Sequence, residues 1–123
     1  MEQFDNEIKQ RIIQELVPGK QITLAHIIAN PDDILYRKLG LDPTVDYSTR
    51  SAIGIVTMSP SEYAVIGADI ALKTSAVTLG FVDRFSGTLI ITGTVSEVTE
   101  SMNSVVSYAK EKLGFTVCEI TKT

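Results

Sequence analysis

A chain of 123 residues is the size of one ordinary domain, and its composition, 44% hydrophobic and 21% charged, is that of a folded globular protein. The net charge of -4, with 11 scattered basic residues and no tryptophan, argues against nucleic-acid binding, which needs clustered cations or stacking aromatics. No apolar run approaches the roughly 20 residues that cross a bilayer, and the polar start is unlike a signal peptide, so we expect a cytoplasmic protein without membrane contact. The single cysteine excludes an internal disulfide.

Residues 1–20 are predicted to form a leader and an arm outside the main domain, which we expect over residues 21–123. Residues 1–10 are polar and mixed in charge. Residues 11–17 are compatible with either a short strand or a short helix, which the following Pro-Gly pair stops. Two arrangements of residues 11–17 stay open: a hairpin onto the next strand, or an arm that pairs with its copies in neighbouring subunits.

Residues 21–29 form an apolar run with several branched side chains, which predicts a buried strand. Asn30 then predicts the start of a short helix as its N-cap, followed by proline in the first turn and by two acids at the positive helix end. Their place in the first turn of a helix explains Asp32 and Asp33 structurally, so a catalytic pair is the weaker interpretation. Gly40 ends this helix, and residues 42–50 read as a polar loop.

Residues 52–57 predict a second strand, and the Ser-Pro-Ser-Glu segment after it predicts a helix start. Ser59 would be the N-cap, with Glu62 completing a capping box. Small residues recur at helical spacing over residues 60–74, which gives this helix a face able to approach a sheet closely. They are Ala64, Gly67, Ala68 and Ala71.

Residues 76–83 and 88–93 predict the two strands of a hairpin with a short turn between them. Ser96 opens a second long helix whose apolar positions keep helical spacing until Gly114, and residues 116–121 predict the last strand. From the second strand onward the order is strand, helix, strand, strand, helix, strand, the split βαβ arrangement of ferredoxin-like α+β domains. Such a sheet leaves edges and one face to be covered, and oligomerisation is one way to cover them.

The sequence offers little catalytic chemistry. His26 is the one histidine and lies within an apolar strand, which favours a hydrogen-bonded structural role, and one histidine with one cysteine gives no zinc-ligand spacing. Residues 18–21 predict a turn rather than a phosphate loop, because Gln14 and Gln21 stand where that loop needs a glycine and a hydroxyl. No pair of catalytic groups can be named, so we expect no enzyme, no cofactor and no metal.

Three stretches resemble one protein family. They are IIQELVPGKQITLAHIIANP at residues 12–31, VDRFSGTLIITG at residues 82–93 and CEITKT at residues 118–123. Together they are similar to the S-type ethanolamine-utilisation and U-type propanediol-utilisation shell proteins of bacterial microcompartments. In the hexameric shell proteins of this class, a run similar to residues 23–31 is the last strand of the domain. Here it comes first, so the resemblance implies a circularly permuted BMC domain with an N-terminal β-arm.

The resemblance implies a structural, non-enzymatic protein. Six copies would form a ring that tiles with other shell proteins around encapsulated enzymes, with a central pore that selects small metabolites by size and charge. Docking of a targeting peptide from an encapsulated enzyme is a further role for the outer surface. The alternative function is a small-ligand-binding regulatory oligomer, since split βαβ domains often bind effectors at subunit interfaces.

The resemblance also assigns residues. It places a pore rim at the hairpin turn, whose residues taken alone read as a structural turn with an exposed Asp-Arg pair: Asp83, Arg84, Phe85, Ser86 and Gly87. It implies a six-copy β-barrel over the pore, built from Ile12, Ile13, Gln14, Glu15, Leu16 and Val17. Lys73 matches an edge lysine that packs between hexamers, although a solvated helix-end lysine is the simpler interpretation. Asn30 replaces the family's edge arginine, so that contact cannot form in the same way.

Overall fold

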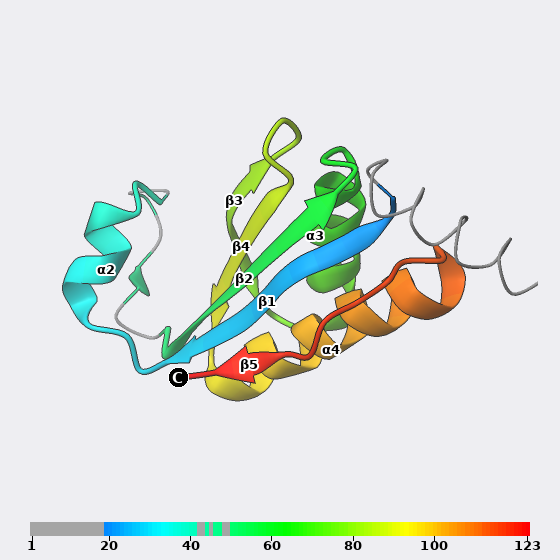
Figure 1. Cartoon of the computed structure of the whole chain (residues 1–123). Coiled ribbons are helices and arrows are strands. Elements are labelled where there is room, and N and C mark those ends of the chain that lie inside the picture. Colours follow the sequence, from blue (N-terminus) through cyan, green and yellow to red (C-terminus); the bar gives the residue numbers. More distant parts are fainter. Residues whose placement is uncertain (1–18, 42–43, 45, 48–49) are drawn as a thin grey trace, which may run out of the picture.

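The computed structural model describes residues 19–41, 44, 46–47 and 50–123. Within these residues, five strands form one sheet in the order β3-β4-β2-β1-β5. Helices α3 and α4 pack against the sheet, and α2 lies beyond the end of β1 (Figure 1). The elements are β1 (Gln21–Ala29), α2 (Asp33–Lys38), β2 (Ala52–Ser59), α3 (Tyr63–Thr74), β3 (Thr78–Asp83), β4 (Thr88–Gly93), α4 (Val95–Lys112) and β5 (Thr121–Lys122).

Strand β2 is the centre of the sheet. It pairs antiparallel with β1 on one side and with β4 on the other, and β3 completes the predicted hairpin with β4. The register shifts between Ile22 and Leu24 in β1 and between Leu79 and Phe81 in β3, so each of these strands carries an irregularity of the bulge type. The mixed α/β domain with the expected hairpin is therefore confirmed.

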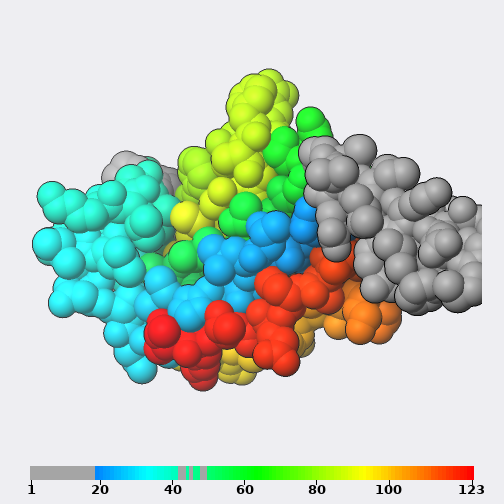
Figure 2. Space-filling view, viewed as in Figure 1, coloured from blue at the N-terminus to red at the C-terminus, as the bar shows by residue number. Residues whose placement is uncertain are grey.

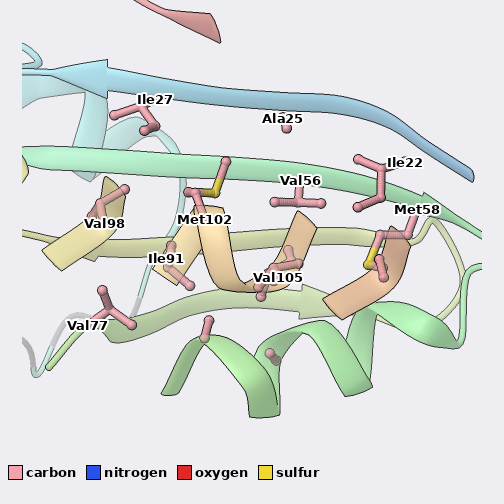
Figure 3. Packing of buried hydrophobic residues seen from close by; sticks show 14 of the residues in the cluster. Ile22, Ala25, Ile27, Val56, Met58, Val77, Ile91, Val98, Met102 and Val105 are labelled. Atoms are coloured by element: carbon pink, nitrogen blue, oxygen red, sulfur yellow. The ribbon is translucent and has the colours of Figure 1, made fainter. Parts of the chain in front are cut away.

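The main core fills the layer between the sheet and the two long helices. Figure 3 shows Val98, Met102 and Val105 of α4 pointing toward Val56 and Ile91 of the sheet, and all five side chains are buried. Helix α3 contributes small side chains to this layer, as its sequence predicts. Its buried residues are Ala64, Gly67, Ala68 and Ala71.

A second apolar cluster anchors α2 to the sheet. Tyr36 of α2 and Leu41 after it are buried together with Ile53 and Ile90, which β2 and β4 contribute to the cluster. The ring of Tyr36 also stacks on Tyr47, with 5.1 Å between the ring centroids. Because neighbouring residues of a strand face opposite sides, this cluster lies on the other side of the sheet from the main core.

The predicted start of α3 is wrong. Ser59 is the last residue of β2, where it pairs with Gln21, and so it does not cap a helix. Helix α3 begins at Tyr63, and Glu62 occupies the N-cap position without a side-chain hydrogen bond. The first N–H groups of the helix donate to carbonyls three residues earlier, which satisfies them without a side-chain cap.

The predicted cap of α2 is also wrong. Asp32 is the N-cap, and its carboxylate accepts a hydrogen bond from the N–H of Ile34 at 3.0 Å. Asn30 instead turns the chain out of β1 with a left-handed φ of 50°, and its N–H donates to the carbonyl of Ser51 at 2.6 Å. Gly40, with a φ of 67°, follows the end of the helix as predicted.

The sequence predicts that helix α4 begins at Ser96, but the helix begins one residue earlier, at Val95. Thr94 is its N-cap and forms a capping box with Glu97, in which each side chain accepts a hydrogen bond from the other residue's N–H. Gly114 lies just beyond the helix end with a φ of 73°, as expected for a terminating glycine. In the part of the chain that the structure describes, no helix is both long and apolar enough to cross a lipid bilayer.

The last strand is shorter than residues 116–121 predict. Thr116 forms an isolated bridge with Gln21, and regular pairing begins only at β5. Strand β5 runs parallel to β1 at the edge of the sheet, and the N–H of Thr123 donates to the carbonyl of Ile27 at 3.0 Å. The C-terminal strand therefore forms this edge of the sheet, beside β1.

Candidate functional site

The turn between β3 and β4, residues 83–87, projects from the body of the domain (Figure 2). Asp83 organises this turn, because its Oδ1 accepts the N–H of Phe85 and its carbonyl accepts the N–H of Gly87, both at 2.9 Å. The donation from Phe85, with a smaller contribution from Ser86, holds the pKa of Asp83 below its ordinary value. The carboxylate therefore has a structural role at the base of the turn.

Gly87 fixes the turn to the last residues of β2. Its carbonyl accepts the N–H of Met58 at 2.8 Å, and its φ of 76° lies in the left-handed region. A Cβ at this position would collide with the carbonyl oxygen of Met58 and would come within 3.1 Å of the Cα of Ser61. The close approach of two backbones is thus possible only with glycine.

Phe85 and Arg84 form the tip of the projecting turn. Phe85 is 80% exposed, an unusual position for a large apolar side chain. The guanidinium of Arg84 lies over its ring, 5.0 Å from the ring centroid, rather than pairing with Asp83. The interpretation of Asp83 and Arg84 as an exposed ion pair is therefore wrong, and the tip presents an aromatic ring with an adjacent positive charge.

Lys73 lies in the last turn of α3. Its Nζ is 2.8 Å from a carboxylate oxygen of Asp69, one turn earlier, and both side chains are largely exposed. The hydrogen bond that Lys73 donates to the carboxylate of Asp69 raises the pKa of Lys73. An exposed ion pair at this spacing adds little to folding stability, so the fold does not depend on either charge.

Asn30 lies in the turn that follows β1, with its side chain exposed. Within the described residues, no hydrogen bond or ion pair joins Asn30 to Lys73. The two residues predicted at the edge of the subunit therefore belong to different elements of the fold.

His26 is hydrogen-bonded, as its place in an apolar strand predicts. Its Nδ1 lies 2.5 Å from Oγ1 of Thr121, and its Nε2 lies 3.0 Å from Oγ1 of Thr123. The imidazole thus joins β1 to the C-terminal segment. Over the described ranges, no three His, Cys, Asp or Glu side chains are grouped closely enough to hold a metal ion.

The predicted barrel segment, residues 12–17, lies outside the described residues. Its pairing therefore stays a prediction. The described chain begins next to it, at Gly19, just before β1.

Sequence reasoning missed the residues that support the site. The contact of Met58 with Gly87 extends the antiparallel pairing of β2 with β4 by one residue, and it depends on a register between strands that has no local sequence signal. The pairing of Asp69 with Lys73 does have one, since opposite charges four residues apart in a helix lie on the same face.

Comparison with known proteins places this geometry in context. Residues 52–121 match the family model of the BMC domain. The chain is 51% identical over 113 residues to the bacterial microcompartment shell protein PduU of Salmonella typhimurium, which covers 92% of this chain and 93% of that protein. It is 50% identical over 115 residues to the shell protein EutS of the same organism, covering 94% and 98%. A solved flat hexamer of CutR matches with a TM-score of 0.78 and 43% identity, covering 87% of this chain and 94% of that one.

Proposed function

This chain belongs to the BMC-domain family of bacterial microcompartment shell proteins, and from this premise we propose that it is a non-enzymatic subunit of such a shell. It assembles as a homohexamer, and the rings tile with other shell proteins around encapsulated enzymes. The observation that carries the proposal is the similarity to a flat hexamer over 87% of the chain. Identities of 51% and 50% to PduU and EutS support compartments of the propanediol- and ethanolamine-utilisation types alike.

Measurement of mass in solution tests the ring. We expect sedimentation equilibrium of the full chain to give about six times the 13.4 kDa of one chain across a wide range of concentrations. A dimer or trimer stabilised by a nucleotide or an amino acid would contradict the proposal and would favour a ligand-binding regulatory oligomer. Incorporation of a tagged copy into purified microcompartments tests the location.

We propose that the domain is circularly permuted. The BMC-domain match begins at residue 52, so β1 precedes it in the sequence. Nevertheless β1 pairs with β2 along almost its whole length and lies inside the sheet, between β2 and β5. A strand that is integral to the sheet but outside the matched segment supports relocation of this strand from one end of the domain to the other.

We propose that residues 83–87 form the rim of a central pore. Support comes from the rigid attachment of the turn at Gly87 and from the exposed Phe85 with its neighbouring guanidinium. The ring then acts as a barrier whose opening is set by six copies of this tip, which would admit small polar metabolites and slow larger ones. In a solved hexamer, the substitutions Phe85→Ala and Arg84→Ala should widen the central opening. A central region unchanged by both substitutions would exclude this role.

We propose that residues 12–17 act as an arm, and that six arms close a small β-barrel over the pore. Support comes from the position of Gly19 and Lys20, which connect this segment directly to β1. A lone strand has open edges, and closure of six strands into a barrel removes them. Deletion of residues 1–18 should leave the hexamer intact in sedimentation while changing passage through the pore. Loss of the ring on deletion would contradict this division of roles.

We propose that Lys73 lies at the edge of the ring, where it contacts the next ring. Its exposure and its place at the end of α3 support this. Asn30 carries no charge at the position of the family's edge arginine, so the contact relies on other side chains. Conversion of Lys73 to Ala should weaken association between rings and leave the ring itself intact.

A further inference from the structure

Lys20 joins the proposed arm to β1, and it contacts three parts of the domain. Its Nζ donates a hydrogen bond to the carbonyl of Leu113 at 3.3 Å, and the same ammonium group lies 5.6 Å from the centroid of the Tyr63 ring. Its own carbonyl accepts the N–H of Thr116 at 2.9 Å. This residue is therefore attached to the domain through both its backbone and its side chain.

The surroundings of the ammonium group suit a cation. Leu113 is the C-cap of α4, and carbonyls at a helix C-terminus lack partners within the helix and carry a partial negative charge. Tyr63 is the first residue of α3, and an edge-to-face contact with the buried Phe115, with 5.0 Å between the ring centroids, fixes its ring. A cation between a carbonyl oxygen and the face of a fixed ring has a defined direction, even though Lys20 is exposed.

Strand β1 has no free edge at its start. On one side, Gln21 and Ile22 pair with the end of β2. On the other side, Gln21 forms a bridge with Thr116, and the N–H of Ile22 donates to the carbonyl of Thr116 at 2.9 Å. A hairpin from residues 11–17 onto β1 would need one of these two edges. A strand formed by residues 11–17 must therefore find its partner outside β1.

The start of β1 and the turn at residues 83–87 lie at the same end of the sheet. Ile22 pairs with Met58 of β2, and the N–H of Met58 donates to the carbonyl of Gly87. Figure 1 shows the first residues of β1 beside the end of β2, where α3 begins. The chain thus enters the domain, at Lys20, at the end that carries the proposed pore rim.

We propose that Lys20 is the positioning residue of the arm. Its contacts with Leu113 and Tyr63 fix the direction in which the chain reaches β1, so that residues 12–17 meet the same segment of the neighbouring copies over the pore. Without the charge, the backbone bond to Thr116 still holds residue 20, but the preceding chain can turn freely, and six arms no longer enter one barrel in a common register. The inference rests on the proposed arm, and it names the residue that directs it.

Hydrogen exchange of the full-length hexamer tests this role, because it reports on the arm and on the domain separately in one sample. In the wild type we expect slow exchange of the amides of residues 12–17. Lys20→Met keeps a long side chain and removes its charge, and it should speed the exchange of those amides by about tenfold. Exchange in β2 should not change, and sedimentation should still give the mass of the hexamer.

Two further substitutions and one control identify the contact. Lys20→Arg keeps a cation that can donate to the carbonyl of Leu113 and lie over the Tyr63 ring, so it should retain most of the protection. Tyr63→Leu removes the ring and should speed the exchange of residues 12–17, as Lys20→Met does. Lys112→Met removes a charge from the last turn of the same helix, and it should leave the exchange of residues 12–17 unchanged.

The outcomes separate this inference from the proposed function. A wild-type hexamer in which residues 12–17 exchange as fast as an unfolded peptide would remove the proposed barrel, and the role of Lys20 with it. Arms that are protected in the wild type and equally protected in Lys20→Met would overturn the role of Lys20 and leave the barrel in place. Faster exchange of β2 together with the arm, loss of the ring, or an equal effect of Lys112→Met would also overturn it, since each would give Lys20 only a general role in stability or charge.

Discussion

Gly87 and Met58 meet backbone to backbone, with the N–H of Met58 donating to the carbonyl of Gly87 at 2.8 Å and no room for a side chain between them. This contact ties the projecting hairpin tip to the end of β2. The orientation of Phe85 and Arg84 depends on it, because these residues lie in the same short turn. The hairpin tip is therefore a supported element rather than a free loop.

Substitution of Gly87 should show the strength of this support. We expect Gly87→Ala to lower the free energy of unfolding by about 2–4 kcal/mol, because a left-handed backbone and a steric overlap both oppose the new Cβ. Gly114→Ala is the control, since Gly114 has a similar φ of 73° but open space around it, and should cost only about 1 kcal/mol. Urea unfolding at one fixed chain concentration measures both. If both substitutions lowered the free energy of unfolding equally, the backbone at Met58 would be able to move away from the new Cβ without destabilising the protein.

The hydrogen bonds of His26 should hold the C-terminal segment on β1. We expect His26→Ala to destabilise this segment by about 1–2 kcal/mol, since two hydrogen bonds to threonine hydroxyls are lost. Hydrogen exchange of the Thr123 amide, which donates to Ile27, should become faster by about tenfold. Thr121→Val removes one of the two partners with little change in shape and should give an intermediate rate. An unchanged exchange rate in both variants would show that the backbone pairing alone holds β5.

The start of α4 should respond to pH through Glu97. Hydrogen bonds from the N–H and the side chain of Thr94 lower the pKa of Glu97 below its ordinary value of about 4.5. A carboxylate with a lowered folded-state pKa stabilises the protein above its unfolded-state pKa, and this contribution is lost as the pH falls through the folded-state pKa. The stability difference between the wild type and Glu97→Gln should therefore be largest near neutral pH and disappear in acid.

Urea unfolding of both proteins between pH 7 and pH 3 measures this difference. Thr94→Ala, which removes the other half of the capping box, should cost about 1 kcal/mol near neutral pH. A difference between the wild type and Glu97→Gln that is independent of pH would assign the effect to the shape of the side chain and not to its charge.

The left-handed backbone of Asn30 should limit which residues this position accepts. We expect Asn30→Arg to cost about 1 kcal/mol of unfolding free energy, because asparagine tolerates a positive φ better than longer side chains do. Asn30→Gly should change stability by less than about 0.5 kcal/mol. Thermal unfolding of the two variants beside the wild type separates them. A fully stable Asn30→Arg would show that this turn can change its backbone conformation.

Patterns that depend on neighbouring residues were predictable from the sequence. The apolar run of β1 gave its bounds, and the small residues of α3 gave its buried face, because alternation and helical spacing act locally. The cap of α4 could also be predicted, since Thr94 and Glu97 have the spacing of a capping box. The predicted start at Ser96 is nevertheless one residue too late. Ser59 failed as a cap because its pairing with Gln21 in the sheet outweighs its local preference.

Contacts between distant segments could not be predicted in this way. The parallel pairing of β5 with β1 depends on the position of α4 beneath the sheet, and nothing local to residues 116–123 specifies it. At the candidate site, sequence similarity pointed to the hairpin turn, whereas the contact of Gly87 with Met58 and the position of Arg84 over Phe85 required coordinates. The apolar residues on the outer side of α3 can be read from the sequence, but their exposure is known only from the structure.

The pairing of β1 with β5 also sets an order of events during folding. His26 and Thr123 are separated by 97 positions, so their contact closes a loop that includes almost the whole domain. Closure of so long a loop costs more chain entropy than closure of the β3–β4 hairpin, and this edge of the sheet should therefore be among the last to form. Until then, the unpaired edge of β1 is a template for a strand from another molecule. A protein that assembles in many copies thus passes through a stage in which exchange of C-terminal strands between chains competes with completion of its own sheet.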